Sequence, residues 1–214
     1  MAKAKTYNDI IEQAKSSNLV DIKRHNIIHA GLEFSGMIRL LKENNKPILY
    51  RKFVETINCF FQTENKNSFD EIHSKLCEWG TKHIWLAENK KHNKSERLIS
   101  YGQIAKTLNV VLKVAIHYSQ LPDEQKANSI RPWLHAAVDT EMMKMLKSKY
   151  KQEMTNSWPK SNEDVCRDQY FQIQNFVRDF ITQNHSVEQI NAVDFDDIYW
   201  NLLNKKGHDQ DNDE

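Results

Sequence analysis

Apolar residues recur at intervals of three and four along most of the chain, which is the spacing of one buried helix face. Polar or proline-containing stretches interrupt this repeat and mark loops. The pattern predicts helices over residues 7–15, 27–42, 48–62, 69–88, 104–115, 140–151, 164–183 and 186–206. The helix that begins at residue 104 is apolar on almost all sides, so we expect it in the middle of the domain.

The composition also favours an all-α fold. The 214 residues include only five glycines and four prolines, with 39% hydrophobic and 28% charged residues. Together with the amphipathic pattern, these values predict one helical domain over residues 1–206. Residues 207–214, GHDQDNDE, form an acidic tail that is predicted to be disordered. The net charge of +1 includes this tail, so the body before it is more basic and compatible with a nucleic-acid partner.

Several classes of protein are disfavoured by the sequence. No apolar run approaches the length of about 18 residues that a membrane-spanning helix needs, and MAKAKTYNDII lacks the apolar core of a signal peptide. We therefore expect a cytoplasmic monomer without a membrane partner. Cys59, Cys77 and Cys166 are scattered without ligand spacing, which predicts reduced structural thiols rather than an iron–sulfur cluster. No cofactor is expected.

Two short blocks carry the candidate chemistry, KTLNVVLKVA from residue 106 and AAVDTEMMK from residue 136. Tyr101 and Gly102 are expected to form a turn, which places Lys106 in the first turn of the apolar helix. Burial and the positive end of the helix dipole would both favour a neutral, nucleophilic amine there. A lysine that reaches solvent from a helix end is the ordinary alternative. Asp139 directly precedes another predicted helix, so we expect it to be the N-cap.

These blocks resemble the helix-hairpin-helix DNA glycosylases, the superfamily of endonuclease III and 8-oxoguanine DNA glycosylase. In that family a glycine-containing hairpin leads into a KTANVVL-like helix with a catalytic lysine, and a VDT segment follows. Ile104 stands where the family hairpin commonly has a second glycine. The separation of Lys106 and Asp139 is nearest to that of the archaeal 8-oxoguanine branch. The matching positions are Gly102, Lys106, Thr107, Asn109, Val110, Val111, Leu112, Ala115, Ala137, Val138, Asp139 and Thr140.

The resemblance implies two small helical lobes with a helix-hairpin-helix and an active-site cleft between them. Residues near 50–150 would form the hairpin lobe, and the N- and C-terminal helices would form the other. It further implies a DNA glycosylase with AP-lyase activity that extrudes a damaged or modified base from the duplex. Lys106 would attack C1′ of the sugar, while Asp139 would stabilise the positive charge that develops on it. Which base is excised, and whether the DNA belongs to the host or a phage, stays open.

Residues around the two blocks supply candidate contacts to DNA. The basic run ENKKHNKSERLISYG precedes the expected hairpin, and cations beside a helix N-terminus can bind phosphate. A solvated loop is the ordinary interpretation of such a run. The candidate phosphate-binding residues are Lys90, Lys91, Lys94, Arg97 and Gly102. The candidate substrate-binding residues are Trp133, His135, Tyr199 and Trp200. A metal at His135 is not expected, because no second pair of ligands accompanies it.

Two other functions are compatible with the sequence. Arg24 and His29 match the spacing of the catalytic motif in HEPN ribonucleases, which would act on RNA without using Lys106. A solvated helix face is the ordinary explanation of that pair. The chain could also be a non-catalytic helical module that binds the phosphates of DNA, in which Lys106 is only a cation.

Overall fold

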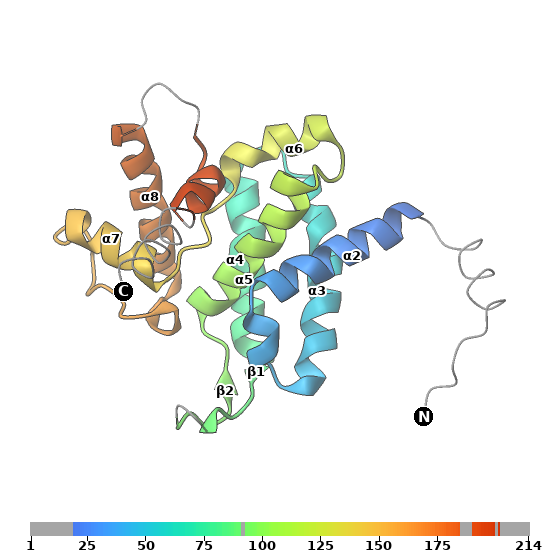
Figure 1. Ribbon diagram of the computed structural model, residues 1–214, viewed down its shortest axis with the longest axis horizontal. Helices are drawn as coiled ribbons and strands as arrows, with labels where there is room; N and C mark the ends of the chain where they lie inside the picture. The colour runs from blue at the N-terminus through green and yellow to red at the C-terminus, as the bar shows by residue number, and fades with distance from the viewer. Residues whose placement is uncertain (1–18, 91–92, 185–189, 200, 202–214) are drawn as a thin grey trace, which may run out of the picture.

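The computed structural model describes residues 19–90, 93–184, 190–199 and 201, and it is mostly helical, as predicted (Figure 1). The α-helices are α2 (Leu19–Phe34), α3 (Lys46–Phe61), α4 (Lys66–His83), α5 (Tyr101–Leu112), α6 (Glu124–Ile130), α7 (Thr140–Tyr150) and α8 (Arg167–Asn184), and residues 192–199 are also helical. A π-helix, η4 (Lys113–Tyr118), continues α5. The 3₁₀ turns are η1 (Met37–Leu40), η2 (Glu43–Asn45), η5 (Arg131–Trp133) and η6 (Asn162–Asp164). The predicted helix over 7–15, most of the one over 186–206 and the tail 207–214 lie outside the described residues.

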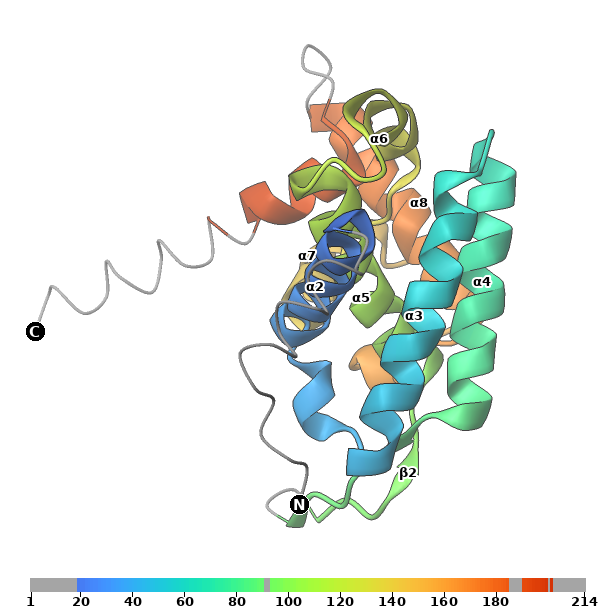
Figure 2. The ribbon, with the colours of Figure 1, turned by 90° about the vertical axis from the view of Figure 1, so that its right-hand side faces the viewer.

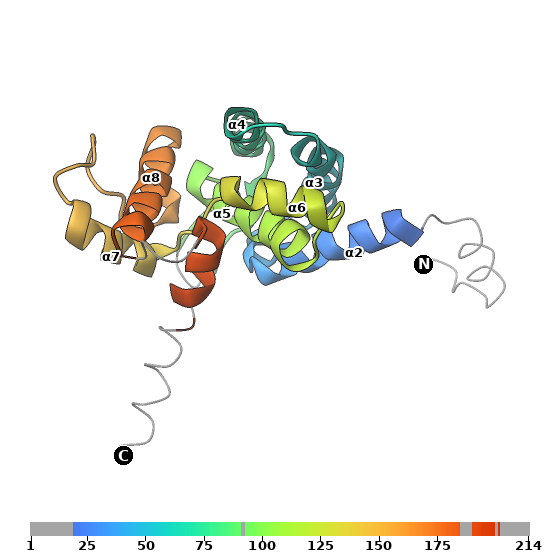
Figure 3. The ribbon, with the colours of Figure 1, turned by 90° about the horizontal axis from the view of Figure 1, so that it is seen from above.

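Helix α5 occupies the centre of the molecule, as its apolar character predicted. It packs against both α4 and α2, which lie on different sides of it, while α7 and α8 lie together at the left of Figure 3. Helices α3 and α4 run next to each other (Figure 2). All residues of α5 except Lys106 and Val110 are buried. Because α5 contacts so many elements, it fixes their positions relative to one another.

The contact between α2 and α5 is unusually close. A Cβ added at Gly31 would lie only 2.8 Å from the Cα of Val111, so the two backbones meet where α2 has no side chain. Helix α2 then ends at Phe34, and Gly36 has a φ of +68°, a left-handed conformation that suits glycine. For this reason the predicted helix over 27–42 is wrong: α2 begins earlier, and the chain turns at Gly36 into η1.

A short antiparallel hairpin, β1 (Trp85–Leu86) and β2 (Arg97–Leu98), connects α4 to α5. The predicted helix over 69–88 therefore continues too far, since α4 ends at His83. Beyond that point burial alternates: Ile84 and Leu86 are buried, while Trp85 is exposed, which is the period of a strand. Helix α5 starts at Tyr101 behind a capping box made by Ser100 and Gln103, so Tyr101 and Gly102 are not the turn we expected.

The helical segment 192–199 is held against the π-helix by charged groups. Lys113 Nζ lies 2.6 Å from a carboxylate oxygen of Asp196 and also pairs with Asp197. The hydroxyl of Tyr118 donates to Asp197 at 2.6 Å. The same segment also lies near the start of α7, since the charge of Asp139 acts on Asp196 and Tyr199. Within the described residues, no helix is long and apolar enough to cross a membrane.

Candidate functional site

An open groove of about 390 Å³ lies beside α5 and includes Lys106 in its lining. The turn after α2, the β-hairpin, α5, the start of α7 and the segment before α8 all contribute to its walls. Its polar lining residues include Lys94, Gln103, Lys106, Thr140 and Glu163. We call it the Lys106 groove. Its size falls within the range of pockets that bind small organic molecules, roughly 300–1,000 Å³.

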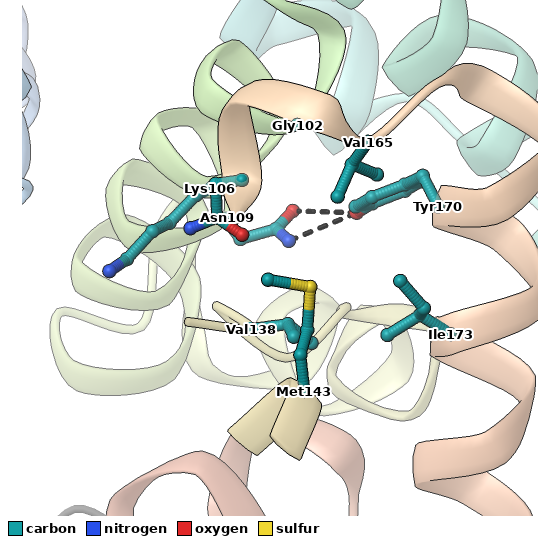
Figure 4. Close-up of a pocket in the computed structure, with 9 residues that line it drawn as sticks. Gly102, Lys106, Asn109, Val138, Met143, Val165, Tyr170 and Ile173 are labelled. Atoms are coloured by element: carbon teal, nitrogen blue, oxygen red, sulfur yellow. Dashed lines mark hydrogen bonds between the residues drawn. The ribbon is translucent and has the colours of Figure 1, made fainter. Parts of the chain in front are cut away.

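Lys106 lies in the second turn of α5, because the helix begins at Tyr101. The residue is half-buried, and no described residue forms a hydrogen bond or ion pair with its ammonium group. Figure 4 shows its side chain extending away from the internal cavity behind it. The prediction of a desolvated lysine in the first turn is therefore wrong in both respects, since the burial and the helix dipole that Lys106 experiences are weaker than expected.

The internal cavity behind Lys106 is too small for a nucleobase. Its volume of about 10 Å³ accommodates at most a single water molecule. Asn109 and Tyr170 point towards each other at its wall, while Val138 and Met143 supply apolar surface (Figure 4). Of the two hollows that Lys106 lines, the Lys106 groove is the one large enough for an extruded nucleoside.

Asp139 is the N-cap of α7, as predicted, and its carboxylate accepts the backbone N–H of Met142 at 2.8 Å. Neither a hydrogen bond nor an ion pair joins it to Lys106 among the described residues. Asp139 lies instead near Asp196 and Tyr199. Burial raises the pKa of the Asp196 carboxyl and of the Tyr199 hydroxyl, and the nearby charge of Asp139 raises both further. The residue after it, Thr140, does line the Lys106 groove.

The cations of the hairpin differ in their surroundings. Lys94 and Arg97 both pair with Glu163 on η6. Lys90 is exposed, and Lys91 lies outside the described residues. Two of the predicted phosphate ligands are thus already paired with one carboxylate of the same chain.

Gly102 does not form a phosphate-binding turn, which corrects our expectation. It is the second residue of α5 and is buried, and its backbone N–H donates to the carbonyl of Val165 at 3.2 Å. A Cβ added there would lie 2.4 Å from the carbonyl oxygen of Asn162. The glycine is required because the segment before α8 packs directly on the start of α5.

The predicted substrate-binding residues are distributed over different environments. His135 is buried and faces the core, so it cannot contact a nucleotide in the groove, and this expectation is wrong. Trp133 is partly buried against the core and does not line the groove. Tyr199 is also partly buried, and its ring stacks on Phe195 at 6.2 Å between centroids. Trp200 lies outside the described residues.

His135 belongs instead to a buried hydrogen-bond network that links α4, α5, residues 134–138 and α8. Its Nε2 lies 3.0 Å from a carboxylate oxygen of Asp70, and its Nδ1 lies 2.7 Å from the hydroxyl of Tyr170. The Asn109 amide donates to the Tyr170 hydroxyl at 2.9 Å and to the carbonyl of residue 136 at 2.8 Å. The last member is His73, whose Nε2 lies 2.8 Å from the side-chain oxygen of Asn109. We call these five side chains the His135 network.

The bonding partners define one consistent set of protonation states. Asp70 accepts from His135 Nε2–H, so His135 Nδ1 accepts the proton of Tyr170. Burial lowers the pKa of His135 to about 4 and that of His73 to about 3. Burial alone would raise the pKa of Asp70, but hydrogen bonds from His135 and Lys66 outweigh it and lower the value to about 2. Both histidines are therefore neutral and Asp70 is ionised at neutral pH.

These shifts predict that acid destabilises the fold. Unfolded histidines bind protons below pH 6.5, whereas folded His135 and His73 resist protonation down to about pH 4 and 3. The free energy of unfolding is therefore highest above about pH 6.5. It decreases as the pH is lowered, by at most about 1.4 kcal/mol per pH unit for each histidine. Urea unfolding at pH 7.5, 6 and 5, followed by tryptophan fluorescence, measures the slope. The exposed His29→Asn variant should keep it. Equal stability at pH 7.5 and 5 would contradict this assignment.

Arg24 and His29, the candidate ribonuclease pair, have different neighbours in α2. Arg24 lies 3.4 Å from Asp21, one turn away. His29 is exposed and lines a separate groove of about 380 Å³ with Glu33 and Tyr50, and Arg24 is not part of that lining. The structure therefore does not bring the two side chains into one pocket.

Comparison of the chain with protein-family models, with curated proteins and with solved structures found no match. In the part of the chain that the structure describes, no group of three or more His, Cys, Asp or Glu side chains is arranged to hold a metal ion.

Sequence reasoning missed the carboxylate that lies in the Lys106 groove. That residue is Glu163, which is 66 residues from Arg97 and 69 from Lys94 along the chain. The sequence SNED around it suggests only a helix cap, and Ser161 and Asp164 indeed form a capping box there. No local pattern indicates that the segment folds back onto the hairpin.

Proposed function

We propose that this protein is a DNA glycosylase with AP-lyase activity, and that the Lys106 groove receives the extruded nucleotide. The observation that carries the proposal is Lys106 itself, an amine that no described residue pairs with, in a groove large enough for a nucleoside. The two sequence blocks that resemble helix-hairpin-helix glycosylases also meet here. Lys106 comes from the first block, and Thr140 comes from the second.

The chemistry needs an amine and a carboxylate next to the sugar. The nucleotide leaves the base stack, which costs a few kcal/mol. As the N-glycosidic bond breaks and its electron pair leaves with the base, Asp139 stabilises the positive charge on the sugar. Lys106 gives a proton to the departing base and forms the new bond to C1′, and cleavage of the C1′–O4′ bond then opens the sugar ring and leaves a Schiff base. Loss of a C2′ proton then expels the 3′ phosphate by β-elimination.

Asp139 keeps the role proposed from the sequence in a modified form. The hydrogen bond that it accepts from the backbone N–H of Met142 fixes its carboxylate at the start of α7. Because the adjacent Thr140 lines the groove, a bound sugar would lie near the carboxylate without Asp139 pairing with Lys106 in the free protein. The positive end of the α7 dipole points to the same place and would favour the departing anionic base.

Borohydride trapping tests the proposal without knowledge of the base. A duplex with an abasic site reports the lyase step, and a panel with oxidised purines and damaged pyrimidines reports base excision. We expect a covalent adduct with the wild type, complete loss of the adduct in Lys106→Ala, and its retention in the exposed control Lys147→Ala. Thermal unfolding checks that both variants fold.

Two results would overturn the proposal. One is an adduct that survives in Lys106→Ala, because another amine would then be the nucleophile. The other is the absence of an adduct on every duplex. Salt-sensitive DNA binding without an adduct would instead indicate a non-catalytic DNA-binding module.

A further inference from the structure

The carboxylate of Glu163 pairs with two cations of the β-hairpin, Lys94 and Arg97, at the Lys106 groove. Both oxygens of Glu163 lie 2.7 Å from Lys94 Nζ, and one oxygen lies 2.5 Å from a guanidinium nitrogen of Arg97. The side-chain amide of Gln103 is 3.4 Å from the same oxygen. Three donor groups from the hairpin and α5 thus make four hydrogen bonds to one carboxylate, which is the geometry of a built anion site.

The same site holds a further cation that has no such partner. Lys106 lines the groove together with Lys94, Gln103 and Glu163, and none of the described residues pairs with it. Lys94 and Arg97 share the single carboxylate of Glu163, and Lys106 lines the same groove as Lys94 and Glu163, so the cations at and beside the groove outnumber this carboxylate. A second anion can approach these cations, but it competes with Glu163 for Lys94 and Arg97.

The Glu163 contacts are of the kind that a stronger anion can replace. The side chains of Lys94, Arg97 and Glu163 remain 43%, 33% and 33% exposed, and ion pairs at such positions contribute only about 0–1 kcal/mol. A phosphodiester offers the same two-oxygen geometry to Arg and Lys as a carboxylate does. Glu163 lies on η6, a single turn of 3₁₀ helix, so its side chain can turn away without unwinding a long helix.

We propose that Glu163 is a built-in competitor for a phosphodiester of the DNA backbone, which binds Lys94 and Arg97 once Glu163 has left them. This inference rests on the proposed function only in taking DNA as the ligand. Glu163 would weaken the binding of DNA that places no nucleotide in the groove. Such DNA gains one phosphate contact, but it must first break the pairs of Glu163 with Lys94 and Arg97. DNA that also places a nucleotide beside Lys106 would compensate for this loss. Glu163 therefore lowers the affinity for DNA that leaves the groove empty, and by doing so it raises selectivity.

Neutralising Glu163 should tighten DNA binding. The change Glu163→Gln is compared with Glu96→Gln, which removes the same charge from the same hairpin region, where Glu96 lies 2.6 Å from Lys42. Fluorescence anisotropy with an unmodified duplex over a salt series is the measurement. We expect at least about fivefold tighter binding for E163Q, at most about twofold for E96Q, and a salt slope steeper by about one to two phosphate contacts only in E163Q. No gain over E96Q would overturn the proposal.

Further variants separate charge from loosening of the segment. Glu163→Asp retains the charge on a shorter side chain, so it should bind DNA much like the wild type, whereas loosening alone would strengthen binding in both variants. Adding Lys94→Ala and Arg97→Ala to E163Q should remove the gain. Inorganic pyrophosphate is tested as a competitor in parallel. If it binds E163Q more tightly while DNA shows no gain, the site binds a small phosphate and the DNA assignment is wrong.

The outcome is independent of catalysis, because an unmodified duplex requires no chemistry. Tighter binding by E163Q without any borohydride adduct would overturn the lyase and keep the Glu163 proposal. A Lys106 adduct without tighter binding by E163Q would do the reverse.

Discussion

Replacing Asn109 with alanine is expected to lower the free energy of unfolding by about 3 kcal/mol. The side chain is buried, with 2% of its surface exposed, and it contacts three partners at once. Its amide donates to the carbonyl of residue 136 and to Tyr170, and its oxygen lies 2.8 Å from His73 Nε2. Alanine would leave these groups without their partner inside the core, where each unsatisfied polar group costs about 1–3 kcal/mol.

The matched control is Asn58→Ala on α3, where the residue is exposed, and it should change the stability by less than about 0.5 kcal/mol. Urea unfolding followed by circular dichroism at pH 7.5 gives both values. A loss of similar size in the two variants would mean that the His135 network does not stabilise the contact between α5, residues 134–138 and α8.

The second large effect is expected at Gly102. Alanine there would place its Cβ 2.4 Å from the carbonyl oxygen of Asn162 and 2.6 Å from the Cβ of Val165, so backbone must move. The hydrogen bond from the Gly102 N–H to the Val165 carbonyl would weaken at the same time. We expect a loss of about 3 kcal/mol, at the upper end of overpacking in a core, and faster hydrogen exchange in residues 161–166, since this segment is held by that contact.

Gly36→Ala provides a comparison for this variant. Gly36 has a left-handed φ of +68°, but an added Cβ would meet only the flexible end of Arg39, at 3.1 Å. The expected cost is the conformational one, about 1–2 kcal/mol, without a change in hydrogen exchange at 161–166. If Gly102→Ala is no more destabilising than Gly36→Ala, the close approach of the segment before α8 is not a determinant of stability.

Local chemistry explains what the sequence predicted correctly. The helical pattern identified a central helix at α5 because its apolar residues surround it, and burial on all sides requires a central place. Asp139 was recognised as an N-cap because its role depends only on the N–H group three residues later. Both predictions rest on interactions within a few residues.

The errors concern contacts between distant segments. Gly102 was interpreted as part of a turn, but its role depends on Val165, which no local pattern connects to it. His135 suggested a substrate contact, yet its partners Asp70 and Tyr170 come from α4 and α8 and enclose it in the core. Glu163 was overlooked for the same reason. Tertiary packing, rather than helical propensity, decides which of these polar residues face solvent.

Gly31 influences the Lys106 groove although it does not line it. Because α2 meets α5 backbone to backbone at this residue, the close contact fixes the distance between α5 and the segment that follows α2. Ser35, Gly36, Met37 and Leu40, which follow α2, line the Lys106 groove together with Gln103 and Lys106 of α5. A bulkier residue at position 31 would push α2 away from α5, and the groove-lining residues that follow α2 would move with it although none of them is changed.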